Sequence, residues 1–175
     1  MPIAVLGYSK TSSMRQLRFL EKRSNRTDME FNPGDKLPMK LIVRTAHLDD
    51  ANAIAPLLLE LGYEVDVEQV RSRLQNLLQS SRHVTLLAEV NDLVAGLCLV
   101  CNVMHLASAG YAEVLELVVQ TSLQRQGIGS LLLRHAQTWA AGQGQFRVRL
   151  RSGVHRAEAH RFYERLGYTK SRASY

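Results

Sequence analysis

Six residues between an expected strand and an expected helix combine the side chains and the backbone freedom that anion binding requires. The segment reads Gln124-Arg125-Gln126-Gly127-Ile128-Gly129, and Ser130 follows it. A helix N-terminus presents unpaired N–H groups and the positive end of the helix dipole. Glycine lets an anion approach the backbone closely, and Arg125 adds a fixed positive charge. A pyrophosphate suits this loop better than a carboxylate, because it can accept several hydrogen bonds in a row.

The spacing of the loop excludes two common phosphate-binding motifs. The chain has no GxxxxGK[ST] segment, and Leu132 stands where the third glycine of GxGxxG would be. A GxG before a helix is by itself equally typical of a tight turn from strand to helix. The loop therefore predicts a phosphate site only together with further motifs.

The elements that position the loop follow from apolar periodicity after residue 39. Helical spacing predicts four helices, near residues 50–62, 67–78, 130–142 and 155–167. The first contains Pro56 and should kink there unless Pro56 lies near its first turn. Strands are expected near residues 41–43, 83–90, 93–104, 111–119, 146–150 and 168–175, with Asn91-Asp92 as a hairpin turn. This order, with hairpins early and crossover helices late, predicts a mixed α/β sheet flanked by helices.

Residues 1–38 differ from the rest in composition. They are rich in lysine, arginine and serine, and they end in the turn-rich segment FNPGDKLP. Apolar periodicity is weak there. We therefore expect two regions, a basic and flexible N-terminal extension over residues 1–38 and one folded domain over residues 39–175.

Composition and charge narrow the partners. The 175 residues carry a net charge of +6, so the binding partner could be nucleic acid, a phosphorylated cofactor or an anionic substrate. Of these three classes of partner, nucleic acid is the least favoured. No apolar run is long enough to cross a membrane, and the first residues do not form a secretory signal, so a cytoplasmic protein is expected. Cys98 and Cys101 have an odd spacing on one strand, which predicts two free thiols on opposite faces and no metal site.

Two motifs in sequence order resemble those of one family. The loop at residues 124–129 resembles the [QR]xxGx[GA] pyrophosphate loop of the GNAT family of N-acetyltransferases, and AHRFYERLGY at residues 159–168 resembles its late AxxFYxxxGF helix. The resemblance covers residues 39–175. Within the family, ELVV and the segment LRSGVHRAEAHRFYERLGY are most similar to small-amine enzymes of the aminoalkylphosphonate type.

The resemblance implies a GNAT fold, with a mostly antiparallel central sheet that opens in a V-shaped split between two central parallel strands. Acetyl-CoA is expected in that split as cosubstrate, without a metal. Its pantetheine arm would pair with the backbone of Leu117, Val118 and Val119, and the amide of Leu117 would donate to the thioester carbonyl. The diphosphate would lie on the amides of residues 126–130, beside Gln124 and Arg125. Where the family often has an asparagine, this chain has Arg156. Either Arg156 or the neighbouring His155 replaces that contact, to phosphate or to substrate, or the contact is missing.

Three residues are expected to act on protons. A primary amine has a pKa near 10 and must lose a proton before it attacks a thioester. Glu113 and Glu116 are the two candidates for the base that takes this proton, and either would act through a water molecule. Because they are three residues apart on one strand, their side chains are predicted to point to opposite faces of the sheet. The resemblance assigns Tyr163 the protonation of the departing thiolate.

The sequence thus predicts an N-acetyltransferase that acts on a small primary amine by direct transfer in a ternary complex. The basic residues of the chain suit an amine that is anionic at its other end. The alternatives are acetylation of protein N-termini or lysines, and a non-catalytic acetyl-CoA-binding regulator. The resemblance also implies a homodimer, because relatives often dimerise through the last strands.

Overall fold

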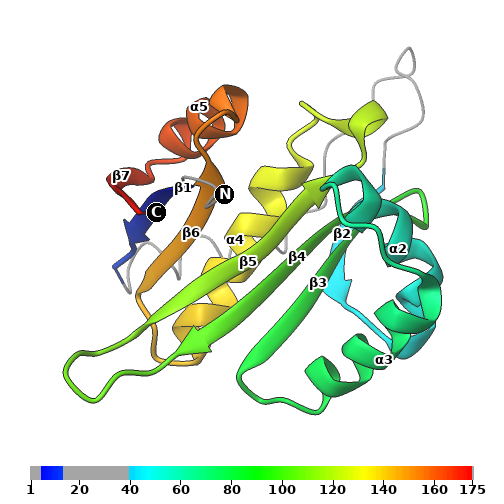
Figure 1. The fold of residues 1–175 in the computed structure, drawn as a ribbon, viewed down its shortest axis with the longest axis horizontal. Helices are drawn as coiled ribbons and strands as arrows, with labels where there is room; N and C mark the ends of the chain where they lie inside the picture. Colours follow the sequence, from blue (N-terminus) through cyan, green and yellow to red (C-terminus); the bar gives the residue numbers. More distant parts are fainter. Residues whose placement is uncertain (1–4, 14–39, 175) are drawn as a thin grey trace.

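The computed structural model describes residues 5–13 and 40–174, and in them a seven-stranded sheet is the central element (Figure 1). The strand order is β2-β3-β4-β5-β6-β1-β7. Its strands are β1 (Val5–Thr11), β2 (Leu41–Thr45), β3 (His83–Val90), β4 (Leu93–Val103), β5 (Tyr111–Val119), β6 (Arg147–Gly153) and β7 (Thr169–Ser174). Among the described pairs only β5 and β6 run parallel, so the expected mixed and mostly antiparallel sheet is confirmed.

Helices cover both faces of the sheet, and each pair of helices encloses its own apolar cluster. The helices are α2 (Ala51–Glu60), α3 (Val67–Leu78), α4 (Ile128–Gly142) and α5 (Ala157–Arg165), with short 3-10 turns η1 (Leu48–Asp50) and η2 (Thr121–Leu123). Helices α2 and α3 pack on one face against Leu87, Leu97 and Val118. Helices α4 and α5 pack on the other face, where Cys98, Val100 and Val114 are buried. None of the helices within the described residues is long and apolar enough to cross a membrane.

Two local expectations are confirmed. Asn91 and Asp92 have φ values of 50° and 65°, as a two-residue hairpin turn between β3 and β4 requires. Both cysteines are free, Cys98 buried in the α4 cluster and Cys101 partly exposed. Pro56 lies inside α2, with four residues of the helix after it.

Strand β1 differs from the flexible N-terminal extension that composition predicted. Residues Val5–Thr11 lie in the sheet between β6 and β7 and run antiparallel to both, although they precede β2 in the chain (Figure 1). The reason is that apolar and β-branched residues in VLGYSKT alternate well enough to fill a position with a neighbouring strand on each side. The rest of the expected extension, residues 14–38, lies outside the described residues.

Two side chains of β1 contact α5, and the backbone of the residue after Thr11 contacts the residue before β6. Tyr8 is 1% exposed, and its ring centroid lies 5.4 Å from that of Tyr163 on α5. Lys10 Nζ donates to the carbonyl oxygen of Leu166 at 2.7 Å, at the C-terminus of α5, where a cation complements the helix dipole. The amide of Ser12 donates to the carbonyl oxygen of Phe146 at 2.9 Å. The segment is therefore an integral part of the sheet.

We expect Tyr8→Ala to lower the free energy of unfolding by roughly 3–5 kcal/mol, because it deletes a buried aromatic ring from the core. Urea unfolding followed by circular dichroism would measure the change. Thr11→Ala, at the exposed end of the same strand, should stay within about 0.5 kcal/mol of the unmodified chain. Equal stabilities for both variants would mean that β1 does not occupy the sheet in solution.

Candidate active site

The parallel strands β5 and β6 separate part of the way along their length. Their pairing runs from Ala112 opposite Val148 to Val114 opposite Leu150. Strand β5 continues to Val119 and β6 to Gly153, with no further pairing between them among the described residues. The expected split between two central parallel strands is therefore present, and it exposes one edge of β5.

The backbone directions of β5 decide which residues present polar groups to the split. The amide of Gln120 donates to the carbonyl oxygen of Ala95 at 2.8 Å, toward β4. Backbone groups alternate along a strand, so those of Val118 also face β4, whereas those of Leu117 and Val119 face away from it. Leu117 and Val119 thus fit the expected backbone site. Val118 does not, because its backbone pairs with β4 and its side chain fills the α2 cluster.

The glycine loop ends at the N-terminus of α4, as predicted. Gly127 is the N-cap residue, with φ 84°, a left-handed value that glycine adopts without a steric penalty. The amide of Leu131 donates to the carbonyl oxygen of Gly127 at 3.0 Å. By the geometry of a helix, the amides of Ile128, Gly129 and Ser130 precede this bond and have no acceptor in the helix. A row of backbone donors therefore points out of the helix end.

Gly129 lets three elements meet beside the split. A Cβ at this position would lie 3.2 Å from Phe162 Cζ on α5 and 3.6 Å from Val119 Cγ2 on β5. The first distance is tighter than most side-chain contacts, and the second is ordinary van der Waals contact. A larger residue would thus press on the Phe162 ring of α5, which would have to shift by a few tenths of an ångström.

The side chains of Gln124 and Arg125 connect the glycine loop to β5 and to α5. Gln124 Nε2 donates to the carbonyl oxygen of Val119 at 3.1 Å, across the turn between β5 and η2. Arg125 has φ 64° and lies 3.3 Å from Glu158 on α5, in an exposed ion pair. Such a pair contributes little stability. The Arg125 guanidinium can therefore exchange Glu158 for a phosphate at low cost.

A β-bulge changes where the two glutamates point. Glu113 is opposite Cys101 of β4 and Glu116 is opposite Leu99, so three residues of β5 span two of β4, with Leu115 as the extra residue. Cys101 and Leu99 share a face, and so Glu113 and Glu116 do as well. The prediction of opposite faces was wrong, because it assumed a strand without a bulge. Both carboxylates lie on the face that α2 and α3 cover in part.

The surroundings of the two glutamates differ. Glu113 is buried, and Arg151 Nε donates to its Oε1 at 2.9 Å. Glu116 lies beyond the last β5–β6 pair, where the strands have separated. Burial raises the pKa of Glu116 above its usual 4.5, partly offset by the charge of Arg73 on α3. Glu116 is thus the carboxylate whose proton affinity is raised beside the split.

Tyr163 on α5 is buried among aromatic rings. Its centroid lies 5.3 Å from that of Phe162 and 6.2 Å from that of Tyr168. Burial raises the pKa of Tyr163 to about 12, against a smaller opposite effect of the positive charge on Arg156. The phenol therefore keeps its proton at neutral pH and can act as a donor.

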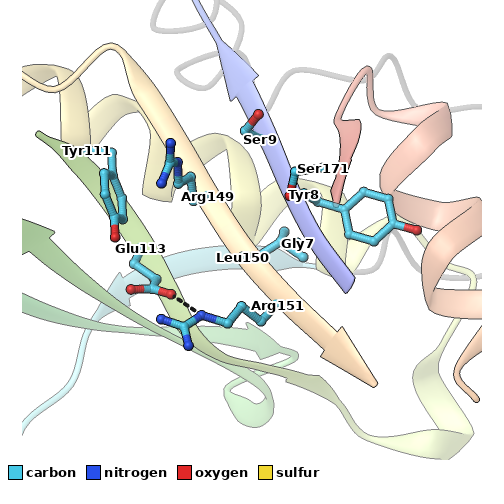
Figure 2. A pocket seen from close by; sticks show the side chains of 9 residues that line it. All are labelled: Gly7, Tyr8, Ser9, Tyr111, Glu113, Arg149, Leu150, Arg151 and Ser171. Carbon is cyan, nitrogen blue, oxygen red and sulfur yellow. Dashed lines mark hydrogen bonds and ion pairs between the residues drawn. The ribbon is translucent and has the colours of Figure 1, made fainter. Parts of the chain in front are cut away.

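A second feature, absent from the predicted site, is a pocket of about 380 Å³ on the sheet face that carries Glu113 (Figure 2). Four strands supply its lining: Gly7, Tyr8 and Ser9 of β1, Tyr111 and Glu113 of β5, Arg149, Leu150 and Arg151 of β6, and Ser171 of β7. Sequence reasoning missed the β1 residues because it placed them outside the domain. The available signal was the run Val5, Leu6, Tyr8, which is typical of a strand.

The same fold occurs among acetyltransferases. An aminoglycoside N-acetyltransferase solved in complex with CoA superposes with a TM-score of 0.72 at 13% identity, over 80% of this chain and 97% of that chain. The likeness in structure defines the fold class of the molecule.

The sequence comparisons define the family. The family model described as Acetyltransferase (GNAT) family matches residues 51–168. Uncharacterized N-acetyltransferase YhdJ of Bacillus subtilis is 30% identical over 115 residues, which are 65% of this chain and 81% of its own. Aminoalkylphosphonate N-acetyltransferase of Salmonella typhimurium is 35% identical over 132 residues, 74% of this chain and 85% of its own. The chain belongs to the GNAT family, and it is an acetyl-CoA-dependent acetyltransferase.

The raised pKa of Tyr163 should appear in the pH dependence of stability. Its folded-state pKa of about 12 exceeds the usual value of about 10, so the stability that it contributes is complete below about pH 10 and is lost as the pH rises to about 12. Tyr163→Phe should make this alkaline loss shallower in urea unfolding, whereas Tyr63→Phe, at a residue 54% exposed, should not. Identical profiles for the unmodified chain and Tyr163→Phe would contradict the assignment.

Proposed function

We propose that this enzyme transfers the acetyl group of acetyl-CoA to the primary amine of a small molecule, directly and within a ternary complex. The observation that carries the proposal is the split between β5 and β6, with the polar backbone of Leu117 and Val119 along it and the N-terminus of α4 at its end. The names of relatives that act on aminoalkylphosphonates and aminoglycosides support a small acceptor.

The residues present fit a coenzyme with a diphosphate and an extended arm. The amides of residues 126–130 would hold the diphosphate, and Arg125 would supplement them with its charge. The backbone of Leu117 and the amide of Val119 would pair with the arm, since the Val119 carbonyl already accepts from Gln124. The amide of Leu117 would donate to the acyl oxygen as negative charge develops there. Arg156, which is exposed at the N-terminus of α5, would add positive charge near the coenzyme from the α5 side. Acetyl-CoA supplies the acetyl thioester when it is bound.

Proton transfer would be divided between the two faces of the sheet. We assign Glu116 as the base, acting through water on the incoming ammonium, because burial raises its proton affinity and it lies beside the split. Glu113 is engaged by Arg151, and we assign it to the acceptor pocket. Tyr163, on the α4 and α5 face, would donate its proton to the thiolate that leaves.

Direct transfer is supported by the state of the cysteines. Burial raises the pKa of Cys98 to about 12, and burial also raises that of Cys101. A thiol that keeps its proton near neutral pH is a poor nucleophile. Neither cysteine is therefore suited to carry the acetyl group between the two substrates.

Thiol release from acetyl-CoA with a panel of small amines tests the function. We expect acetylation of at least one small primary amine, with intersecting lines when the initial rate is measured at varied concentrations of both substrates. Parallel lines would refute direct transfer. A panel of peptides with free N-termini or lysines, if acetylated in preference, would refute the small-molecule acceptor.

Isosteric variants distinguish the two glutamates. Glu116→Gln should lower kcat by roughly a hundredfold to ten-thousandfold, as loss of a general base does. Its acidic limb in the pH profile of kcat/KM, which the raised pKa of Glu116 places above 4.5, should disappear. Glu113→Gln should act mainly on KM for the amine. A larger fall in kcat for Glu113→Gln than for Glu116→Gln would reverse the assignment.

A further inference from the structure

The segment between β5 and α4 has few buried contacts that hold it in place. Residues 120–127 are exposed except for Leu123, which packs partly against the α4 cluster. The amide of Gln120 fixes the start of the segment at the carbonyl oxygen of Ala95, and the buried Ile128 fixes its end in α4. A segment with few buried contacts opens readily. The position of the amides at the start of α4 therefore depends on the polar contacts of the residues between these two ends.

One of these contacts comes from α2, which lies on the face of the sheet opposite α4. Glu60 is the last residue of α2, and its Oε2 accepts from the Thr121 amide at 2.8 Å and from the Thr121 hydroxyl at 2.9 Å. Thr121 is the first residue of η2, whose N-cap residue Gln120 makes no side-chain capping bond. Glu60 thus caps η2 from another element. Because the acceptor is a carboxylate, these two hydrogen bonds are stronger than neutral ones.

The stability of α2 does not account for a carboxylate at residue 60. The last residue of a helix meets the negative end of the helix dipole, and the last turn of α2 carries no basic residue. Side chains of α2 pack with Val118, near the end of β5, in one apolar cluster. Helix α2 is thus seated against β5 two residues before Gln120, and Glu60 extends this contact to η2.

The other side-chain hydrogen bonds of the segment differ from that of Glu60. Gln124 Nε2 donates to the carbonyl oxygen of Val119, within the turn itself. Arg125 pairs with Glu158, a contact that is lost when Arg125 turns to a phosphate. In the part of the chain that the structure describes, Glu60 therefore provides the side-chain contact that joins this segment to another element and need not be exchanged for the coenzyme.

We propose that Glu60 is a positioning residue for the coenzyme. By holding Thr121 it fixes the segment that leads to the amides of residues 126–130, so that these amides are already in place when the diphosphate arrives. A ligand binds more tightly to a site that is ordered beforehand. The inference rests on the proposed function, which places the diphosphate at these amides, and it goes beyond that function in giving α2 a part in coenzyme binding.

Calorimetric titration of the enzyme with CoA, without an acceptor, tests the inference. Glu60→Ala should raise the Kd for CoA about 3- to 10-fold, as loss of one hydrogen bond does. Glu60→Gln, which keeps a side-chain oxygen that accepts from Thr121, should recover most of the affinity. Deuterium exchange at the Thr121 amide should be faster in Glu60→Ala, because the acceptor of this amide is gone.

Control variants separate the Glu60 contact from a general effect of charge. Glu64→Ala removes the same charge four residues further along the chain, at an exposed residue, and should leave the Kd for CoA unchanged. Thr121→Val keeps the amide and loses the hydroxyl, so it should raise the Kd less than Glu60→Ala does. The double variant should bind CoA as weakly as Glu60→Ala alone, because both changes remove parts of one contact.

The results separate the positioning role from the proposed function. If Glu60→Ala is folded by circular dichroism and binds CoA as tightly as the unmodified enzyme, the positioning role is refuted and the proposed function stands. If Glu64→Ala weakens binding as much as Glu60→Ala, the effect is one of charge and the role is also refuted. If Glu60→Ala does not fold, Thr121→Val decides, and an unchanged Kd refutes the role. If the unmodified enzyme binds no CoA, the proposed function is refuted and the inference with it.

Discussion

The separation of β5 from β6 after three paired residues is the constraint on which the rest of the molecule depends. A closed sheet would satisfy the backbone of Leu117 and Val119 with a neighbouring strand. Here the Val119 carbonyl accepts from Gln124 Nε2, whereas the amide of Val119 and the polar groups of Leu117 remain at an open edge. Unpaired backbone groups in a partly buried place are costly unless a ligand or water satisfies them. The glycine loop closes the same opening at its end, because α4 begins there with its own unpaired amides.

The bulge at Leu115 couples this opening to the chemistry. It shifts the register of β5 against β4 by one residue, which turns Glu116 onto the face of Glu113. On the opposite face the same strand contributes to the cluster that buries Tyr163. The sheet thus lies between the Glu116 carboxylate, whose pKa is raised, and the Tyr163 phenol, which keeps its proton. The split between β5 and β6 lies between these two groups. An amine and a coenzyme entering from opposite faces could meet there without exchanging places.

Strand β1 extends the sheet beyond β6 and links the N-terminus to the site. Its position between β6 and β7 gives both strands a hydrogen-bonded neighbour, which removes two edges that would otherwise be open to other chains. Its residues also serve both faces: Tyr8 packs against Tyr163 in the core, while Gly7 and Ser9 line the pocket of Arg149. A segment that composition sets apart from the domain is therefore part of its sheet and of the lining of this pocket.

The elements after residue 39, the glycine loop and the late helix with Tyr163 could be predicted from the amino acids, because periodicity, turn residues and short motifs are local properties of the chain. These motifs also indicated the family and the two glutamates. The folded chain was needed to establish the place of β1, the common face of Glu113 and Glu116, the turning of Val118 toward β4, and the pocket that Arg149 lines. These depend on pairing between residues far apart in the chain, and a single bulge or an inserted strand changes that pairing without a clear mark in the local sequence.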